Sequence, residues 1–335
     1  MNKFNKTLSI AGSSLLILMV AAGCLQNDWE EDEQREKEII QAYLTENNIP
    51  ESALTEGGIY YIEDVPGTGS TPVRDDFIVI EYVGRYIEDN RIHETTYDSL
   101  KDDWSASASF KYYVYGPVKF IFGYSIPGMN EGIAWMKEGG KSTMVIPSDK
   151  AFYDFHPLVY EVELIKVITD PEQFEDSVLV EYLAVKGYDE TTRYDSIWFK
   201  ETVTPDPADP VTVEAQDTVL LRFTGRLVDG YWSEIRDNRV FDTNTDDEAP
   251  LKIVYKGKTS NPVIVSGSIL SWPPGLVTAI DTMRSGTHAT AVVRYQEGFG
   301  DDGLYNSQYG YLIVPQYQTI VYDIVVEEIL PAAAK

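Results

Sequence analysis

The sequence predicts an α+β fold that is built twice, with each copy an antiparallel sheet curved around one short helix. Residues 275–293 (GLVTAIDTMRSGTHATAVV) align without a gap to residues 128–146 (GMNEGIAWMKEGGKSTMVI), so one segment of the chain is duplicated. Most other segments alternate apolar and polar side chains with a period of two, which is typical of half-buried strands. Each copy has one helical pattern inside its run of strands, and this segregation of strands from helices favours the α+β class.

The duplicated segment indicates a short helix followed by a strand. Its apolar side chains recur at i, i+4 and i+7 and therefore share one face of a helix. These positions are Met129, Ile133 and Met136 in the first copy and Leu276, Ile280 and Met283 in the second. Gly139 and Gly140 favour a helix end, and residues 141–147 then resume a strand pattern.

The other elements recur in the same order, and each copy starts with a helical pattern and a strand. The paired segments are 39–48 with 178–187, 56–65 with 194–203, 76–90 with 217–230, 117–123 with 262–268, and 158–167 with 320–329. Tyr97 and Asp98 align with Phe241 and Asp242. Two stretches that differ between the copies, 100–116 and 244–261, follow these pairs.

The composition excludes some classes of partner. The chain has 335 residues, about the length of two ordinary domains, and a formal net charge of -27. A protein this acidic is repelled by phosphate backbones, which argues against nucleic-acid binding, and its charge suits solubility outside the cytoplasm. Cys24 is the only cysteine, so no intramolecular disulfide is expected.

The N-terminus reads as a lipoprotein signal. Lys3 and Lys6 precede a short apolar run that ends in AAG and Cys24, and the run is too short for a membrane-spanning helix. The AAGC string resembles a bacterial lipobox, which implies a lipid anchor on Cys24 and attachment to the outer membrane, at its periplasmic face or the cell surface. An ordinary signal peptide cleaved near Ala22 is the alternative. The acidic run 25–38 fits a solvated tether, a helix start or a surface-export signal.

These patterns divide the chain into five parts. The second copy starts after a short polar link near Pro171, and the Pro-rich segment 204–210 reads as a loop inside that copy. The predicted parts are a lipoprotein signal peptide at 1–23, an acidic tether with a short helix at 24–54, a first sheet domain at 55–168, a linker with a short helix at 169–193, and a second sheet domain at 194–335.

The order of the segments resembles that of the FKBP-type peptidyl-prolyl isomerase family. The first copy has EYVG (81–84), YDS (97–99), PVKFIFG (117–123), IPGMNEGIAWMKEG (126–139) and LVYEVEL (158–164). The second has RFTG (222–225), FDT (241–243), PGLVTAIDTMRSG (274–286) and IVYDIVV (320–326). The resemblance covers 55–168 and 195–330, and it implies two tandem FKBP-like domains, as in tandem FKBP-like lipoproteins of the Bacteroidetes type.

The resemblance implies a peptidyl-prolyl cis-trans isomerase that helps extracytoplasmic proteins fold. Rotation about an X-Pro bond is slow because the C–N bond is partly double. An apolar pocket that removes the imide from water eases this rotation without a nucleophile, a metal or a cofactor. The expected partners are therefore proline-containing polypeptides. His93, His156 and His288 are isolated in the sequence and read as surface or loop residues.

The family motifs also imply two pockets, of which we expect the second to carry the activity. In the second copy the implied catalytic residues are Asp242, Phe223, Phe241, Leu276, Phe299, Val314 and Tyr322, with Val263 beside them. In the first copy the implied substrate-binding residues are Tyr82, Tyr97, Asp98, Ile126, Met129, Phe152 and Tyr160, with Val118 beside them. The aspartate of each pocket would be its main polar group.

Both pockets depart from the family pattern. Met129 and Leu276 stand where the family usually has tryptophan, and Phe152 and Phe299 replace a tyrosine that donates a hydrogen bond to the substrate. The first copy also lacks the loop that covers the family's pocket. A non-catalytic binding module is therefore the alternative function.

The apolar pocket residues also fit an ordinary core, and Asp242 fits an Asx-turn. Acid pairs such as Asp301-Asp302 fit solvated loops or calcium ligands.

Overall fold

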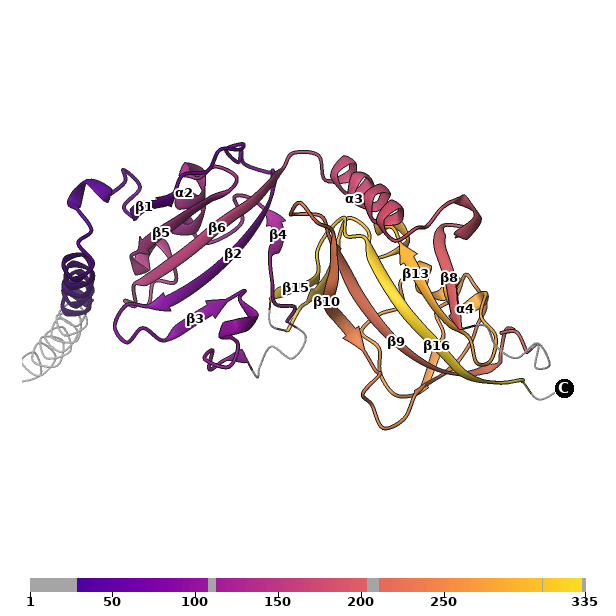
Figure 1. The fold of residues 1–335 in the computed structure, drawn as a ribbon. Helices are drawn as coiled ribbons and strands as arrows, with labels where there is room; N and C mark the ends of the chain where they lie inside the picture. The colour runs from indigo at the N-terminus through magenta and orange to yellow at the C-terminus, as the bar shows by residue number, and fades with distance from the viewer. Residues whose placement is uncertain (1–28, 108–112, 204–210, 309, 333–335) are drawn as a thin grey trace, which may run out of the picture.

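The computed structural model describes residues 29–107, 113–203, 211–308 and 310–332, and it contains two sheet domains joined by a helix (Figure 1). The predicted signal peptide and Cys24 lie outside the described residues. Within the described ranges, no helix is both long enough and apolar enough to cross a membrane. A helix covers residues 29–46 before the first domain, so residues 29–38 of the acidic run are already helical, ahead of the predicted start at 39.

Domain 1 is a six-stranded antiparallel sheet with one helix. Its elements are β1 (Tyr60–Val65), β2 (Phe77–Tyr86), β3 (Ile92–Thr95), β4 (Val118–Ile121), α2 (Pro127–Trp135), β5 (Gly140–Ile146) and β6 (Leu158–Ile168). The strand order is β1-β5-β6-β2-β3, and β4 pairs with the same strand β2. Met129, Ile133 and Met136 are buried, which confirms that this stripe faces the sheet.

Domain 2 repeats this plan after α3 (Pro171–Val185), whose first turn is capped by the side chain of Asp170. Its elements are β7 (Arg193–Tyr194), β8 (Ile197–Val203), β9 (Thr218–Asp229), β10 (Arg236–Thr243), β11 (Leu251–Val254), β12 (Val263–Ser266), α4 (Pro274–Asp281), β13 (His288–Val293), β14 (Leu304–Asn306), β15 (Tyr311–Val314) and β16 (Ile320–Leu330). The main sheet has the order β12-β11-β9-β16-β13-β8-β7, and β14 with β15 forms a separate hairpin.

The packing of helix on strand confirms the gapless duplication. A Cβ atom on Gly128 would lie 2.4 Å from Ile146 Cγ2, and one on Gly275 would lie 2.4 Å from Val293 Cγ1. Both glycines therefore let the helix approach the same point of the neighbouring strand. The α+β class with two tandem domains is thus confirmed.

One alignment between the two copies that the sequence predicts is wrong. The segment 117–123 was matched to 262–268, but β4 pairs with β2 just as β11 pairs with β9, in the registers Ile80↔Val118 and Leu221↔Leu251. The residue of domain 2 that is equivalent to Val118 is therefore Leu251. Val263 lies on β12, an additional strand that pairs with β11, and its side chain is exposed. The proline-valine string that the two segments share misled the alignment.

A buried interface joins the two domains. Lys119 of β4 contacts Glu175 of α3 with 2.7 Å between Nζ and Oε1, and each side chain is 1% exposed. Lys119 also donates to the carbonyl of Tyr317, and Arg239 of β10 donates to the carbonyl of Pro117 at 2.8 Å. Residues of β4 and of β15 line one cavity between the two domains.

Candidate active site

An aromatic cluster lies between the sheet and the helix of domain 2. The ring of Tyr322 on β16 lies 6.3 Å from that of Phe223 on β9 and 5.7 Å from that of Phe241 on β10. Leu276 of α4 and Val314 of β15 complete the cluster, and all five side chains are almost fully buried. The structure therefore brings together the apolar residues predicted for the second pocket, in a closely packed arrangement.

Gly225 makes the close ring packing possible. A Cβ atom at this position would lie 2.6 Å from the Phe241 ring and 2.8 Å from the Tyr322 ring, too near for any side chain. Gly84 holds the same place in domain 1, where a Cβ atom would lie 2.5 Å from Tyr160. The glycine that ends EYVG (81–84) and RFTG (222–225) thus has a physical reason in each domain.

Asp242 is the polar group of the domain 2 cluster. Its Oδ2 accepts a hydrogen bond from the backbone N–H of Leu270 at 2.8 Å. Burial raises the pKa of Asp242 to about 6, and the Leu270 and Thr243 N–H groups oppose this shift because they stabilise the charged form. Leu270 belongs to the segment between β12 and α4, so this segment covers the carboxyl group.

Two further side chains complete the site. Phe299 lies 5.9 Å from Phe241, with the rings nearly perpendicular, and it has no hydroxyl group to donate. Trp272, close to the start of α4, packs against the same core, and its buried Nε1 has no hydrogen-bond partner among the described residues. Sequence reasoning missed Trp272, although a tryptophan just before a Pro-Pro-Gly helix start was a readable signal.

Domain 1 holds an equivalent site, but its residues differ from the predicted ones. Asp242 pairs with Gly225 across β9 and β10, and Glu94 pairs with Gly84 across β2 and β3. The alignment of Tyr97 and Asp98 with Phe241 and Asp242 is therefore wrong. Glu94 stands at the position of Asp242, and His93, expected to be a surface residue, stands at the position of Phe241.

Hydrogen bonds and ring contacts support the corrected equivalence. Thr96 Oγ1 accepts from the N–H of Tyr82 at 2.9 Å, and Asn244 Oδ1 accepts from the N–H of Phe223 at 2.7 Å. The His93 ring lies 5.0 Å from Phe152, as Phe241 lies against Phe299. The strings ETT (94–96) and DTN (242–244) carried this signal, which the stronger likeness of YDS to FDT obscured.

The remaining predicted residues of domain 1 separate into two groups. Tyr82 and Tyr160 lie 5.9 Å apart, and both donate to Glu94, at 3.2 Å to Oε2 and 2.7 Å to Oε1. Met129 and Ile126 lie beside them, and Phe152 is 47% exposed. By contrast, Asp98 is exposed in a short 3-10 turn and pairs with Lys101, and Tyr97 packs against Val83 on a different cluster.

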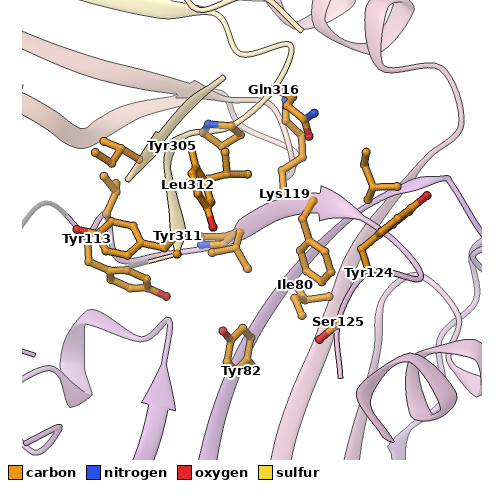
Figure 2. Close-up of a pocket in the computed structure, with 18 of the residues that line it drawn as sticks. Ile80, Tyr82, Tyr113, Lys119, Tyr124, Ser125, Tyr305, Tyr311, Leu312 and Gln316 are labelled. Atoms are coloured by element: carbon orange, nitrogen blue, oxygen red, sulfur yellow. The ribbon is translucent and has the colours of Figure 1, made fainter. Parts of the chain in front are cut away.

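A cavity of about 500 Å³ opens next to the domain 1 site (Figure 2). Tyr82, Glu94 and Met129 of domain 1 line one side, and Tyr305 and Tyr311 of the domain 2 hairpin line the other. In the part of the chain that the structure describes, no three histidine, cysteine, aspartate or glutamate side chains gather as metal ligands would.

The family match rests on both domains. The model of the FKBP-type peptidyl-prolyl cis-trans isomerase family matches residues 68–165 and 209–327, together more than half of the chain. The chain belongs to the FKBP-type peptidyl-prolyl isomerase family. The two matched regions each contain one of the sites described above, so the sites occupy equivalent places in two family domains.

Individual relatives cover less of the chain. The protein named probable FKBP-type peptidyl-prolyl cis-trans isomerase FkpA of Neisseria meningitidis is 33% identical over 146 residues, which are 41% of this chain and 48% of that protein. Escherichia coli FkpA is 26% identical over 156 residues, which are 44% and 51% of the two proteins. The chain thus spans about half the length of these curated relatives.

Solved structures are similar only in part. The crystal structure of Escherichia coli FkpA gives a TM-score of 0.33 at 21% identity, with 50% of this chain and 74% of that chain covered. The three FKBP domains of wheat FKBP73 give a TM-score of 0.28 at 16% identity, with 82% and 96% covered. The assignment to the family rests on the family match and not on these scores.

Proposed function

We propose that this protein is a cofactor-free peptidyl-prolyl cis-trans isomerase that acts on polypeptides outside the cytoplasm, with its catalytic pocket in domain 2. The observation that carries the proposal is the buried carboxyl of Asp242 beside the rings of Phe241 and Tyr322. The named isomerase activity of the FkpA relatives supports it.

Rotation about the X-Pro bond requires only an apolar pocket that excludes water from the imide. Phe223, Phe241 and Leu276 would hold the proline ring and remove the imide from water, which disfavours the charge-separated resonance form and eases rotation about the C–N bond. The pocket accelerates the reaction only if it binds the twisted bond better than the planar one. Phe299 cannot donate a hydrogen bond to the twisted carbonyl, and we propose the Nε1 of Trp272, which has no partner among the described residues, as the donor in its place.

The location is a separate part of the proposal. Cys24 would carry the lipid that holds the chain to the outer membrane, with both domains in the cell envelope. Metabolic labelling with a fatty acid tests this part. The wild-type protein should take up label and the Cys24→Ser variant should not, whereas equal labelling of both would rule out an anchor at this residue.

A protease-coupled isomerisation assay of the full chain in detergent tests the activity. Asp242→Ala should lower kcat/KM by about tenfold, equivalent to about 1.4 kcal/mol of transition-state stabilisation. Asp98→Ala is the matched control, since its exposed carboxyl lies outside both sites. An Asp242→Ala variant with unchanged kcat/KM would move the catalytic pocket away from domain 2.

A non-catalytic binding module is the second candidate, and one observation favours it. Phe223, Phe241, Leu276 and Tyr322 are almost fully buried, so a proline ring enters only if the segment around Leu270 moves. Turnover no faster than the uncatalysed reaction, together with measurable binding of a proline-containing peptide, would establish this function in place of the enzyme.

A further inference from the structure

The cavity between the domains has the size of a ligand site and is lined by both of them. Its volume of about 500 Å³ lies within the range of small-ligand pockets, about 300–1,000 Å³. Figure 2 shows Tyr82 and Tyr124 of domain 1 and Tyr305 and Tyr311 of domain 2 around the same space. Neither domain alone encloses this space.

The hairpin of domain 2 supplies the wall that domain 1 lacks. The chain between β5 and β6 of domain 1 covers only residues 147–157, whereas the matching connection of domain 2 covers 294–319 and forms β14 and β15. Ile313 and Val314 anchor the hairpin in the domain 2 core. Tyr305, Tyr311 and Leu312 line the cavity opposite Tyr82.

The interface fixes the two walls relative to each other. Lys119 and Glu175 pair in the interior, and the ring of Tyr317 packs edge-on against Phe77 at 5.7 Å. Arg239 bridges from Asp229 of β9 to the carbonyl of Pro117. The cavity is therefore formed before any ligand arrives, which reduces the ordering cost of binding.

Among the described residues, Glu94 is the charged side chain of the cavity wall that lacks an ion-pair partner. Lys119 and Arg239 both line it, but each already has a buried carboxylate partner, Glu175 and Asp229, at 2.7 Å and 2.6 Å. Glu94 makes no ion pair among the described residues. Its two oxygens accept from Tyr82 and Tyr160, and a carboxylate has lone pairs left for further donors.

Aromatic rings stand around this carboxylate. Tyr82, Tyr113 and Tyr311 line the cavity, and the rings of Tyr113 and Tyr311 lie 5.4 Å apart across the domain boundary. Aromatic faces attract ammonium and guanidinium groups, and a nearby carboxylate adds a direct charge partner. The acidic surface of the whole chain, with a net charge of -27, would also draw cationic segments towards it.

We propose that the two domains together form a second binding site, which takes a lysine or arginine side chain of a partner polypeptide. Glu94 pairs with its charge, the tyrosines of both domains surround its alkyl stem, and the domain 2 hairpin closes the site. The site does not use Asp242 and does not depend on isomerase activity.

Fluorescence anisotropy tests this proposal. The full chain is titrated against a labelled alanine peptide with blocked ends, in which one central lysine is the sole charged side chain. The same peptide with norleucine in place of lysine keeps the alkyl stem and loses the charge. We expect the lysine peptide to bind at least about tenfold more tightly than the norleucine peptide, and salt to reduce the difference. Equal affinity of the two peptides would overturn the proposal.

Variants then locate the site. Glu94→Gln should abolish the preference for lysine, and Tyr305→Ala should weaken binding about fivefold without unfolding the chain, since Tyr305 is 56% exposed. Asp98→Asn, an exposed acid of the same domain, and Asp242→Ala should leave the affinity unchanged. Loss of binding in Asp242→Ala, or unchanged binding in both Glu94→Gln and Tyr305→Ala, would contradict a site between the domains.

Discussion

The two domains place a carboxylate at the same point of the same sheet and then surround it differently. In domain 2, Asp242 lies beside phenylalanine rings and is covered by the N–H of Leu270. In domain 1, Glu94 accepts from two tyrosines and lines an open cavity. The two sheets are alike, so the connecting segments cause the difference. In domain 2 the segment between β12 and α4 covers the site, whereas the site of domain 1 is bounded by the β14–β15 hairpin of domain 2.

The largest expected effect separates the roles of two equivalent lysines. Lys119 and Lys252 occupy the same register position on β4 and β11, but only Lys119 is buried with a charge partner. Lys119→Met leaves Glu175 buried and unpaired, and should lower the free energy of unfolding by about 3–5 kcal/mol. Urea denaturation measures this change. Lys252→Met is the control and should cost less than about 1 kcal/mol; equal costs would mean that the interface does not depend on the pair.

The second prediction compares the two close ring contacts. Gly225→Ala should destabilise the protein by about 1–3 kcal/mol, because the added Cβ would collide with both Phe241 and Tyr322. Gly84→Ala should cost less, since only Tyr160 lies in its way. Thermal unfolding of both variants ranks them. The reverse order would show that the domain 2 cluster is the looser of the two.

The third prediction concerns pH. Burial raises the pKa of Asp242 from 3.8 to about 6, so the native state holds this proton more tightly than the unfolded chain. The resulting stabilisation is fully present below about pH 4 and is lost as the pH rises through 6. The free energy of unfolding of Asp242→Asn should therefore exceed that of the wild type by about 1 kcal/mol at pH 7.5, a value already reduced because the carboxyl is partly exposed. At pH 4 the two free energies should be equal. Chemical denaturation at both pH values measures it, and a gain that does not vary with pH would contradict the shift.

The smallest expected effect tests the corrected equivalence. Asp98→Ala removes an exposed ion pair with Lys101 and should change the free energy of unfolding by less than about 0.5 kcal/mol. Glu94→Ala leaves the hydroxyls of Tyr82 and Tyr160 without their acceptor, and should cost about 1–3 kcal/mol. Urea denaturation of the two variants compares them. A larger cost at Asp98 would restore the pairing that the register excludes.

The predictions from the sequence succeeded where the pattern was local. The stripe of Met129, Ile133 and Met136 determined which helix face is buried, because side chains spaced by about one turn share a face. The final strands of each copy were predictable because their apolar and polar side chains alternate with a period of two. The packing of Phe223, Phe241 and Tyr322 into one cluster also follows from the order of their strands.

The predictions failed where register depended on loop length. The connection between β9 and β10 covers 230–235, and that between β2 and β3 covers 87–91. The register then shifts twice within the β9–β10 pairing and once within the β2–β3 pairing. The short sequence similarity between YDS (97–99) and FDT (241–243) therefore led to Asp98 as the equivalent of Asp242, whereas hydrogen bonding across the strands identifies Glu94. The same cause made Val263 look equivalent to Val118.

The sequence by itself determined the duplication, the α+β class and the family, because these depend on periodic patterns and the order of motifs along the chain. Only the tertiary structure decided that Glu94, and not Asp98, is the carboxylate of the domain 1 site, and which segments cover each of the two sites. Glu94, Tyr311 and Lys119 are far apart from their partners in sequence, and nothing local marks their contacts. Packing of one domain against the other, through a buried ion pair and a borrowed hairpin, brings them together.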